Sequence, residues 1–387
     1  MMDDRSTEVI IAGAGPAGLA TSACLTRYSI PHVVLEREQC HSSLWKMKAY
    51  DRCNLHLAKE FCQLPHMPHM SHLPTYIPRK SFIEYLDSYV DFFNIRPIYH
   101  RCVESAFYEQ KAKIWSVLTK NTEEKDDRSR DLFTGKFLVV ATGENSEGNI
   151  PDIKGLESFT GKMMHSSEYK TGFKFNGKKV LVVGCGNSGM EIAYDLSNHG
   201  AKTSIVVRSP FHVVTKEMIR VGMSLMRYLN CPIWLVDFLI LVWTKFKFGN
   251  LSKYKIFKPA EGPMLGKAVR GRSPVIDVGT IKHIKTDKIK VTSGISNIEG
   301  SKVTFVNGEQ EDFHAIIFAT GYKCTTKNWF KENYFLDETG MPLQKFPHHW
   351  KGKNGVYCAG FSQKGLAGVS FDAQLIADDI ANKLNDT

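Results

Sequence analysis

Two short glycine-rich stretches in this sequence have the spacing that binds the pyrophosphate of a dinucleotide. Residues 13–18 and residues 184–189 each read Gly-x-Gly-x-x-Gly, and each follows a short β-branched run. In this motif the first glycine permits a tight strand-to-helix turn, the second lets the pyrophosphate approach bare backbone, and the third lets the helix pack on the strand. The N-terminus of the following helix adds free amide donors and partial positive charge. The glycines are Gly13, Gly15, Gly18, Gly184, Gly186 and Gly189.

The residue at the end of the next strand distinguishes the two stretches. Glu36 and Arg208 stand at nearly the same offset from the first glycine of their own motif, and Ser209 follows Arg208. A carboxylate there can accept hydrogen bonds from both ribose hydroxyls and repels a 2′-phosphate, whereas a guanidinium offers forked donors that suit one. We therefore interpret the first site as an FAD site and the second as an NADPH site. The alternatives are ordinary glycine-rich turns and, for Arg208, a solvated strand end.

Strands and helices in a defined order must position these loops. Buried strands are predicted to end in the turns Ala141-Thr142-Gly143 and Thr320-Gly321, and a further strand ends at Gly360. A closing helix is expected from about residue 371 to residue 384, and its N-terminal end could face the FAD phosphates. Apolar residues at helical spacing also predict a core helix. They are Phe82, Tyr85, Leu86, Tyr89, Val90 and Phe93.

The order of these elements predicts an α/β fold with two Rossmann-like dinucleotide-binding domains. The NADPH-binding domain, residues 161–314, is expected to be inserted into a discontinuous FAD-binding domain, residues 1–160 and 315–387. No long linker or low-complexity tract separates them.

Composition limits the class of protein further. The chain has 387 residues, of which 43% are hydrophobic and 23% charged, enough for two domains with a core each. No apolar signal peptide opens it, and its nine cysteines form neither a Cys-x-x-Cys pair nor a zinc-like grouping, so we expect a cytoplasmic protein with reduced thiols and no metal.

The net charge of +10 comes without an Arg-rich arm or a basic stripe interleaved with aromatics. We therefore expect no nucleic-acid binding; a basic surface would instead gather anions such as NADPH and an acidic substrate.

The stretch 223–246 is strongly apolar and has to be weighed as a membrane segment. Pro232 interrupts it, Asp237 lies inside it, and Arg227 and Lys245 bracket it closely. The uninterrupted run is shorter than the roughly 20 residues that cross a bilayer. A buried or pocket-covering helix is predicted, and peripheral attachment to a membrane surface is the alternative.

Longer motifs resemble a known family. Phe159-x-Gly161-x-x-x-His165-x-x-x-Tyr169 is similar to the identifying motif of flavin-containing monooxygenases, and residues 318–322 are similar to their second signature. More narrowly, the chain resembles the plant YUCCA group, the indole-3-pyruvate monooxygenases of auxin biosynthesis. The resemblance runs nearly end to end and includes residues 44–46, 50–52, 55–57, 61–65, 141–145, 184–191, 206–209 and 274–279.

This resemblance implies an activity. NADPH would reduce FAD, and the reduced flavin would react with O₂ to give a C4a-(hydro)peroxyflavin. That species would attack the carbonyl carbon of indole-3-pyruvate, which would lose CO₂ to give indole-3-acetate. The resemblance thus implies FAD and NADPH as cofactors, indole-3-pyruvate and O₂ as partners, and a cytoplasmic enzyme, with the surface of the endoplasmic reticulum as an alternative location.

The resemblance also implies site residues. His56 stands where the broader family has an asparagine against the flavin, and Ala58 replaces the family's proline. His56 and Asn145 are the predicted catalytic residues, and each could contact flavin or nicotinamide; a core histidine and a turn asparagine are the alternatives. Lys59, Arg52 and Trp45 are candidate neighbours of the flavin or of a substrate carboxylate. The expected FAD site comprises Gly13, Gly15, Gly18, Glu36, Trp45, Ala141, Thr142, Gly143 and Gly360, and the expected NADPH site comprises Gly184, Gly186, Asn187, Ser188, Gly189, Arg208, Ser209, Thr320 and Gly321.

Three other functions fit the same scaffold. The first is a monooxygenase for soft nitrogen or sulfur nucleophiles. The second is a plain flavin reductase, which without a redox cysteine pair would pass electrons to O₂ or a soluble acceptor. The third is a nucleotide-sensing interaction protein without catalysis.

Overall fold

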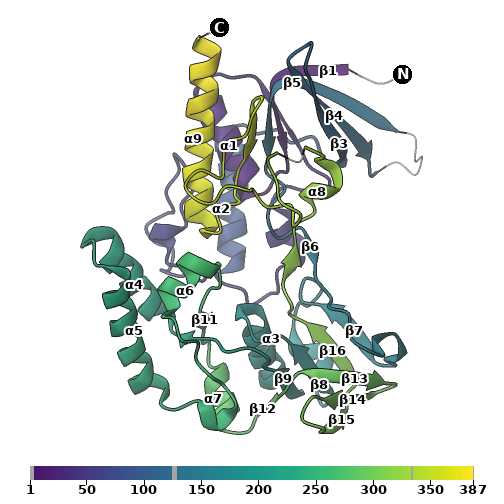
Figure 1. Cartoon of the computed structure of the whole chain (residues 1–387), viewed down its shortest axis with the longest axis vertical. Helices are drawn as coiled ribbons and strands as arrows, with labels where there is room; N and C mark the ends of the chain where they lie inside the picture. The colour runs from purple at the N-terminus through teal and green to yellow at the C-terminus, as the bar shows by residue number, and fades with distance from the viewer. Residues whose placement is uncertain (1–3, 124–128, 333, 387) are drawn as a thin grey trace. The chain divides into compact units, whose positions relative to one another are not determined.

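The computed structural model describes residues 4–123, 129–332 and 334–386. These residues form two compact units (Figure 1). The first unit comprises Met1–Met47, Lys59–Glu147 and Tyr322–Thr387, and the second comprises Lys48–Ala58 and Gly148–Gly321.

The first unit is built on a six-stranded sheet in the order β2-β1-β5-β4-β3, with β18 also paired to β5. Strands β1, β2, β5 and β18 are parallel, and in their registers Ala12 pairs with both Leu35 and Val140, while Cys358 pairs with Val140. The residues that follow these four strand ends therefore gather at one edge of the sheet. The strands are β1 (Asp4–Ala12), β2 (His32–Leu35), β3 (Arg101–Glu109), β4 (Ile114–Asn121), β5 (Arg130–Val140) and β18 (Val356–Cys358).

Helices α1 (Pro16–Arg27) and α9 (Gly365–Asn385) pack against each other beside this sheet (Figure 1). Helix α9 begins six residues before the predicted start near residue 371, because a glycine-containing stretch that reads as a loop forms its first turn. Helix α2 (Arg79–Phe92) buries the periodic apolar face that the sequence predicts, which confirms a core helix there. The remaining short elements are η1 (Leu44–Lys48), η2 (Lys59–Phe61), β6 (Glu147–Gly148), β17 (Tyr322–Lys323) and α8 (Thr326–Trp329).

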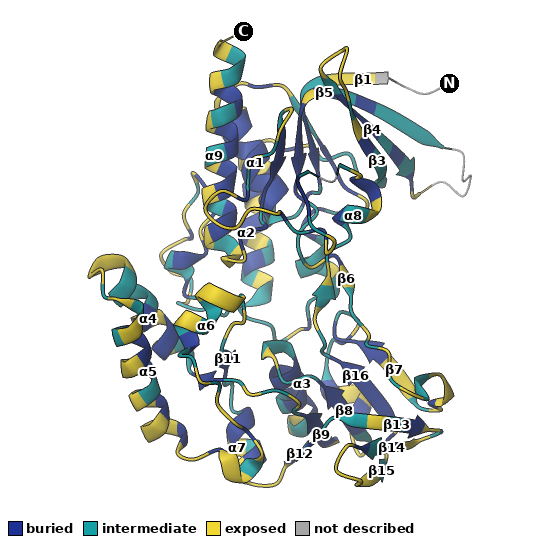
Figure 2. Cartoon of the chain, viewed as in Figure 1, coloured by how far each residue is buried: buried dark blue, intermediate teal, exposed yellow. Residues whose placement is uncertain are grey.

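The second unit contains a five-stranded parallel sheet in the order β12-β9-β8-β16-β7. Val183 pairs with both Val206 and Phe318, so the chain leaves three strands at the same edge, and α3 (Asn187–Asn198) follows β8 there. The five strands differ in burial, because the three central ones are almost wholly buried and the two edge strands only in part (Figure 2). They are β7 (Lys162–His165), β8 (Lys179–Val183), β9 (Lys202–Val206), β12 (Ile289–Thr292) and β16 (Ala315–Phe318), and a separate antiparallel sheet contains β13 (Ile295–Glu299), β14 (Lys302–Phe305) and β15 (Gln310–Asp312).

Between β9 and β12 the chain forms a helical layer. Helix α5 (Ile233–Phe248) packs against α4 (Lys216–Tyr228) and α6 (Pro263–Arg270). The apolar stretch is predicted to form a buried or a pocket-covering helix, and the first of these is wrong for one face of α5, which is exposed (Figure 2). Within the described residues, no helix is both long and apolar enough to cross a membrane. The other elements are β10 (Val213–Val214), β11 (Val275–Ile276), α7 (Thr280–Lys285), η3 (Leu156–Ser158), η4 (Gly172–Phe175) and η5 (Ser252–Tyr254).

Candidate functional site

The first glycine loop is packed tightly at its two ends and open in its middle. Gly13 has φ +109°, and a Cβ there would lie 2.5 Å from the carbonyl oxygen of Ala141. A Cβ on Gly18 would lie 1.9 Å from the carbonyl oxygen of Gly13. A Cβ on Gly15 would meet nothing within 4 Å. The two outer glycines are therefore required by packing, and the bare backbone at Gly15 faces open space, as the predicted pyrophosphate site requires.

Helix α1 begins at this open position. Its N-cap is Gly15, which provides no side-chain hydrogen bond to the first turn, and Pro16 follows. Helices usually begin with a Ser, Thr, Asp or Asn that satisfies these amides. The first turn of α1 thus keeps its positive end and its amide donors for an anion.

Glu36 joins this loop to the end of β2. Its side chain is buried; Oε2 accepts a hydrogen bond from the backbone N–H of Ala14 at 2.7 Å, and Oε1 accepts one from Glu38 at 3.0 Å. Burial raises the pKa of Glu36, while the two backbone hydrogen bonds and the charge of Arg37 oppose that rise. A carboxylate has about four acceptor positions. Glu36 can hold the loop in place and still accept from ribose hydroxyls.

Two further turns reach the same edge of the first sheet. In the turn after β5, Thr142 Oγ1 lies 3.0 Å from Oγ1 of Thr326, and Gly143 has φ +79°. In the turn after β18, the N–H of Gly360 donates to Asp372 Oδ2 at 2.9 Å, and a Cβ on Gly360 would lie 2.8 Å from Cβ of Ala17. The structure therefore brings the predicted FAD residues of these turns together with the glycine loop and Glu36.

Trp45 lies in the segment that adjoins the first glycine loop. The N–H of Ser42 donates to the carbonyl of Ala14 at 2.8 Å, and the ring of Trp45 packs edge to face on Phe82 at 4.7 Å between centroids. Lys59, in contrast, directs its ammonium group to backbone. Its Nζ donates to the carbonyls of Met70, Ser71 and Leu73 at 3.3, 2.8 and 2.6 Å, so it fixes that loop.

The second glycine loop repeats the geometry of the first. Gly184 also has φ +109°, and its Cβ would lie 2.4 Å from the carbonyl oxygen of Ala319. The Cβ of Gly189 would lie 2.0 Å from the carbonyl oxygen of Gly184, and that of Gly186 would meet nothing within 4 Å. Gly186 is the N-cap of α3 and provides no side-chain bond. Each unit therefore contains one glycine loop of the same form, a cradle with an open middle position at the start of a helix.

The polar residues predicted around the second loop divide into two groups. Arg208 is exposed beyond the end of β9, and its charge opposes the rise that burial causes in the pKa of the Cys185 thiol, within the loop. Arg208 thus lies beside the loop, and Ser209 is half-buried next to it. Asn187 instead accepts a hydrogen bond from the N–H of Ile276 at 2.7 Å and anchors β11. Ser188 is half-buried.

The turn after β16 is held by side chains of the same unit. Thr320 Oγ1 donates to the carbonyl of Asn149. His165 Nε2 lies 2.9 Å from the carbonyl oxygen of Gly321, and its Nδ1 lies 3.0 Å from Ser167 Oγ. Burial lowers the pKa of His165. His165 therefore fixes the conformation of the chain at Gly321.

The predicted catalytic residues lie in different units. His56 belongs to the second unit, where its Nε2 is 3.1 Å from Oε1 of Glu191 in α3. Asn145 belongs to the first unit and is exposed on the turn after β5. Glu191 is only 3% exposed. Burial and the nearby carboxylate of Glu191 raise the pKa of Tyr50, whereas burial lowers the pKa of Lys216 and Glu191 opposes that change.

Sequence reasoning did not identify Glu191 as part of the site. The available signal was a carboxylate two residues after Gly189 in a helix whose other inward positions, apart from Asp195, are apolar or glycine. A second acid on the same helix, Asp195, accepts from Tyr169 at 2.6 Å and lies 3.9 Å from the Arg52 guanidinium. That guanidinium also stacks 4.6 Å from the ring centroid of Tyr194. Helix α3 therefore holds the 48–58 segment through both Arg52 and His56.

Comparison with known proteins adds to this geometry. A family model described as flavin-binding monooxygenase-like matches residues 6–341. The probable indole-3-pyruvate monooxygenase YUCCA10 of Arabidopsis thaliana is 50% identical over 380 residues, which cover 98% of each chain. The indole-3-pyruvate monooxygenase YUCCA6 of the same plant is 44% identical, over 97% of this chain and 90% of that protein.

Solved structures share the fold. A flavin-containing monooxygenase from Stenotrophomonas maltophilia gives a TM-score of 0.72 at 18% identity, over 98% of this chain and 99% of that chain. OTEMO, in a complex with FAD and NADP, gives a TM-score of 0.76 at 15% identity, over 99% of this chain and 86% of that chain. These likenesses confirm the predicted α/β fold with two Rossmann-like parts.

Proposed function

Because the chain belongs to the flavin-binding monooxygenase-like family, we propose that it is an NADPH-dependent FAD monooxygenase that converts indole-3-pyruvate to indole-3-acetate. The reaction consumes one NADPH, one proton and one O₂, and it yields NADP⁺, water, CO₂ and the shorter acid. The observation that carries the cofactor assignment is the repeated cradle. Gly15 and Gly186 face open space in the same way, while Glu36 adjoins one loop and Arg208 the other.

FAD is assigned to the first unit. The predicted FAD domain, residues 1–160 and 315–387, also includes residues 48–58, 148–160 and 315–321, which belong to the second unit. The uncapped first turn of α1 would hold its pyrophosphate, and Glu36 would hold its ribose. The turns at residues 141–143 and at Gly360 would complete the site from neighbouring strand ends. When bound, FAD supplies the redox chemistry with NADPH and O₂.

NADPH is assigned to the second unit, which contains the predicted domain of residues 161–314 and also β16 with the turn that follows it. The first turn of α3 would hold its pyrophosphate, and the exposed Arg208, with Ser209, would hold its 2′-phosphate. Asn187 would act indirectly, because its amide is bonded to β11 and so fixes the first turn of α3. Thr320 and Gly321 would shape the neighbouring turn.

Substrate identity rests on the similarity to the two Arabidopsis proteins, whose names give indole-3-pyruvate as the substrate. We also assign the enzyme to the cytoplasm, which the nine free cysteines support. No feature of the described residues favours a soft nitrogen or sulfur nucleophile over a 2-oxo acid. Product analysis decides between these two classes of substrate.

Product analysis tests the proposal. Purified protein loaded with FAD is given NADPH and, in separate reactions, indole-3-pyruvate, phenylpyruvate, a tertiary amine or a thioether. We expect indole-3-acetate and CO₂ to form in equal amounts with NADPH consumed. Formation of an N-oxide or sulfoxide without decarboxylation would assign the alternative activity. NADPH consumption that no substrate accelerates or converts to product would identify a flavin reductase.

A further inference from the structure

Helix α5 exposes a continuous apolar face. Trp234, Phe238, Val242 and Phe246 follow one another at intervals of four residues, so they form a single row along the helix. Their exposed fractions are 68, 59, 39 and 85%. Leu239 and Trp243, also exposed, form the next row. Soluble proteins rarely expose a contiguous apolar surface of this kind without a partner for it.

The opposite face of α5 fixes the helix to its unit. Val236 and Ile240 are buried against Gly222 of α4, where an added Cβ would lie 3.1 Å and 3.0 Å from their side chains. Asp237, the acid inside the apolar stretch, accepts hydrogen bonds from the N–H groups of Met264 and Leu265 at 2.7 and 3.0 Å. The buried carboxylate of Asp237 therefore caps the N-terminus of α6. Because this face of α5 packs on its own unit, the apolar row on the opposite face points toward solvent.

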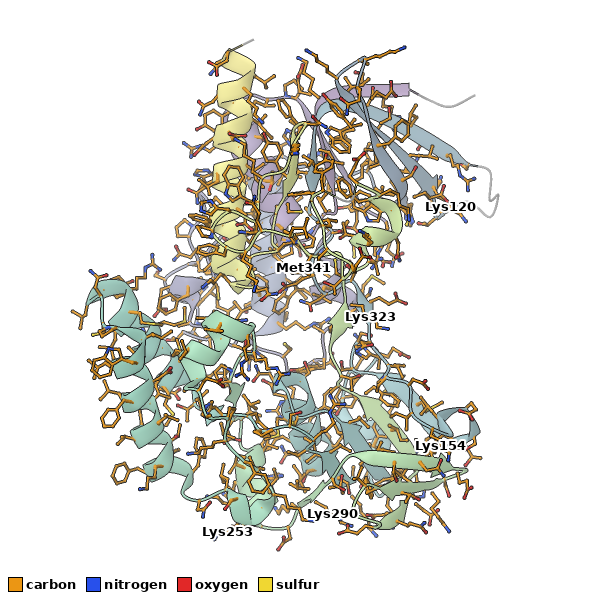
Figure 3. All side chains as sticks on the ribbon, in the orientation of Figure 1. Lys120, Lys154, Lys253, Lys290, Lys323 and Met341 are labelled. Carbon is orange, nitrogen blue, oxygen red and sulfur yellow. The ribbon has the colours of Figure 1, made fainter. Side chains whose placement is uncertain are left out.

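The surface around α5 carries nearly all of the net charge of the protein. Residues 216–272, all of which the structure describes, contain eleven Lys or Arg and three Asp or Glu, a formal charge of +8 out of +10 for the whole chain. Of the three acids, Asp237 is buried and Glu261 pairs with Arg270. Lys245 and Lys247 flank the exposed row of α5, and Lys253, labelled in Figure 3, follows the helix.

Neighbouring helices extend the same surface. Near the end of α4, a shallow hollow is lined mainly by apolar side chains, together with one arginine and one serine. Exposed apolar residues also occur beyond α5, in the connection to α6 and on α6 itself. The hollow is lined by Arg220, Val221, Ser224, Leu225, Tyr228 and Leu229, and the other exposed apolar residues are Phe257, Leu265 and Val269.

We propose that the exposed surface of α4, α5 and α6 binds an anionic lipid bilayer, with α5 lying in the plane of the interface. Its sixteen residues span about 24 Å at 1.5 Å per residue, and roughly 20 residues are needed to cross a bilayer. The inner face of α5 is also apolar, because it packs on its own unit. On the outer face, exposed tryptophans suit the headgroup level of a membrane, and the flanking lysines are attracted to anionic lipids. Protein–protein interfaces are instead depleted in lysine, which favours the lipid surface as the occupant.

The apolar contribution is tested by vesicle co-sedimentation of the FAD-loaded protein. The vesicles contain phosphatidylcholine alone or phosphatidylcholine with phosphatidylserine. We expect binding to the mixed vesicles and a loss of about tenfold or more in the partition coefficient for the double variant Phe238→Glu with Phe246→Glu. A matched double variant, Phe92→Glu with Phe173→Glu, changes two phenylalanines that are 70 and 75% exposed elsewhere. It should bind as wild type does.

The charge contribution is tested on the same vesicles. Lys245→Glu with Lys247→Glu should weaken binding, added salt should do likewise, and Lys111→Glu with Lys302→Glu, at other exposed positions, should have little effect beyond its general charge change. FAD content and the thermal midpoint of each variant show that it is folded. Absence of wild-type binding to mixed vesicles would overturn the proposal. So would a wild-type dimer in sedimentation velocity that Phe238→Glu with Phe246→Glu converts to a monomer, without any vesicle binding by the wild type.

Discussion

The imidazole of His56 and the carboxylate of Glu191 lie 3.1 Å apart, although 135 positions separate them in the chain. Glu191 stands on α3, the helix whose first turn forms the second glycine cradle. This contact and the stacking of Arg52 on Tyr194 hold the 48–58 segment on α3. We infer that the position of His56 is set by the same helix that would hold the NADPH pyrophosphate.

The pair is expected to act as one unit. His56→Ala leaves the buried carboxylate of Glu191 without this partner, and Glu191→Gln removes the charge while keeping the shape. Each variant should lower the fraction of consumed NADPH that appears as indole-3-acetate, with the remainder released as hydrogen peroxide. The double variant should convert the same fraction of consumed NADPH to indole-3-acetate as the more impaired of the two single variants. Losses that multiply independently would show that the contact has no role in coupling.

Alanine substitution of the two open glycines tests the two cofactor sites independently. Gly15 and Gly186 have φ −73° and −72°, which alanine also adopts, so each alanine variant should keep its unfolding free energy within about 1 kcal/mol. Gly15→Ala should weaken FAD binding about tenfold or more, because the added methyl group occupies the pyrophosphate position. Gly186→Ala should keep FAD and raise KM for NADPH. Absorbance titration of apoprotein and steady-state kinetics measure the two effects.

The outer glycines provide the matched control. Gly18→Ala places a Cβ within 1.9 Å of a carbonyl oxygen, so it should destabilise the protein by about 1–3 kcal/mol. A Gly15→Ala protein that binds FAD as tightly as wild type would place the pyrophosphate elsewhere. Exchange of the two phenotypes, with FAD lost from Gly186→Ala, would reverse the assignment of the cofactors.

Arg208 is expected to select the phosphorylated nicotinamide. Arg208→Ala should reduce the ratio of kcat/KM for NADPH to that for NADH by about 10- to 100-fold, because hydrogen bonds to charged groups contribute about 1.5–3 kcal/mol. Arg272→Ala removes another exposed arginine of the same unit and should leave the ratio unchanged. An unchanged ratio in Arg208→Ala would mean that another residue reads the 2′-phosphate.

Glu36 is expected to make the unfolding free energy of the FAD-free protein depend on pH. In the FAD-free protein, burial raises its pKa above the value in the unfolded chain, so the folded state binds the proton more tightly. The contribution of Glu36 to stability is then largest at acid pH and is lost as pH rises through the folded-state pKa. The unfolding free energy of wild-type apoprotein, relative to Glu36→Gln, should therefore increase as pH is lowered from about 8 to about 5. Urea unfolding at several pH values measures this difference, and a decrease over that range would contradict the buried carboxylate.

Asp237 provides a test of the helical layer. Because its carboxylate accepts two N–H groups at the start of α6, Asp237→Ala should lower the unfolding free energy by about 1–2 kcal/mol. Asp237→Asn keeps one acceptor and should cost less. Thermal and urea unfolding of both variants give the comparison, and equal effects would argue against the cap.

The parts of the site that depend on local sequence could be predicted. The Gly-x-Gly-x-x-Gly spacing, Glu36 and Arg208 all follow from strand-loop-helix geometry within one βαβ unit. The core helix could also be predicted, because Phe82, Tyr85 and Tyr89 have helical spacing. These features involve residues a few turns apart, so the pattern itself carries the signal.

The parts that depend on long-range packing could not. His56 meets Glu191 only because the 48–58 segment folds onto α3, and the three carbonyls that hold Lys59 come from a loop with no motif. The exposed face of α5 could not be predicted for a related reason. An apolar stretch indicates that its residues avoid water, and it does not say whether protein or lipid covers them.

We propose that this one chain passes electrons from NADPH to FAD and uses them to oxygenate a 2-oxo acid. The direct measurement is absorbance of the FAD-loaded protein under anaerobic conditions during titration with NADPH, followed by addition of O₂ and indole-3-pyruvate. We predict that one equivalent of NADPH bleaches the visible flavin band and that O₂ with indole-3-pyruvate restores it with one equivalent of indole-3-acetate. A purified protein that takes up no flavin, or a reduced flavin that reoxidises with indole-3-pyruvate unchanged, would contradict the claim.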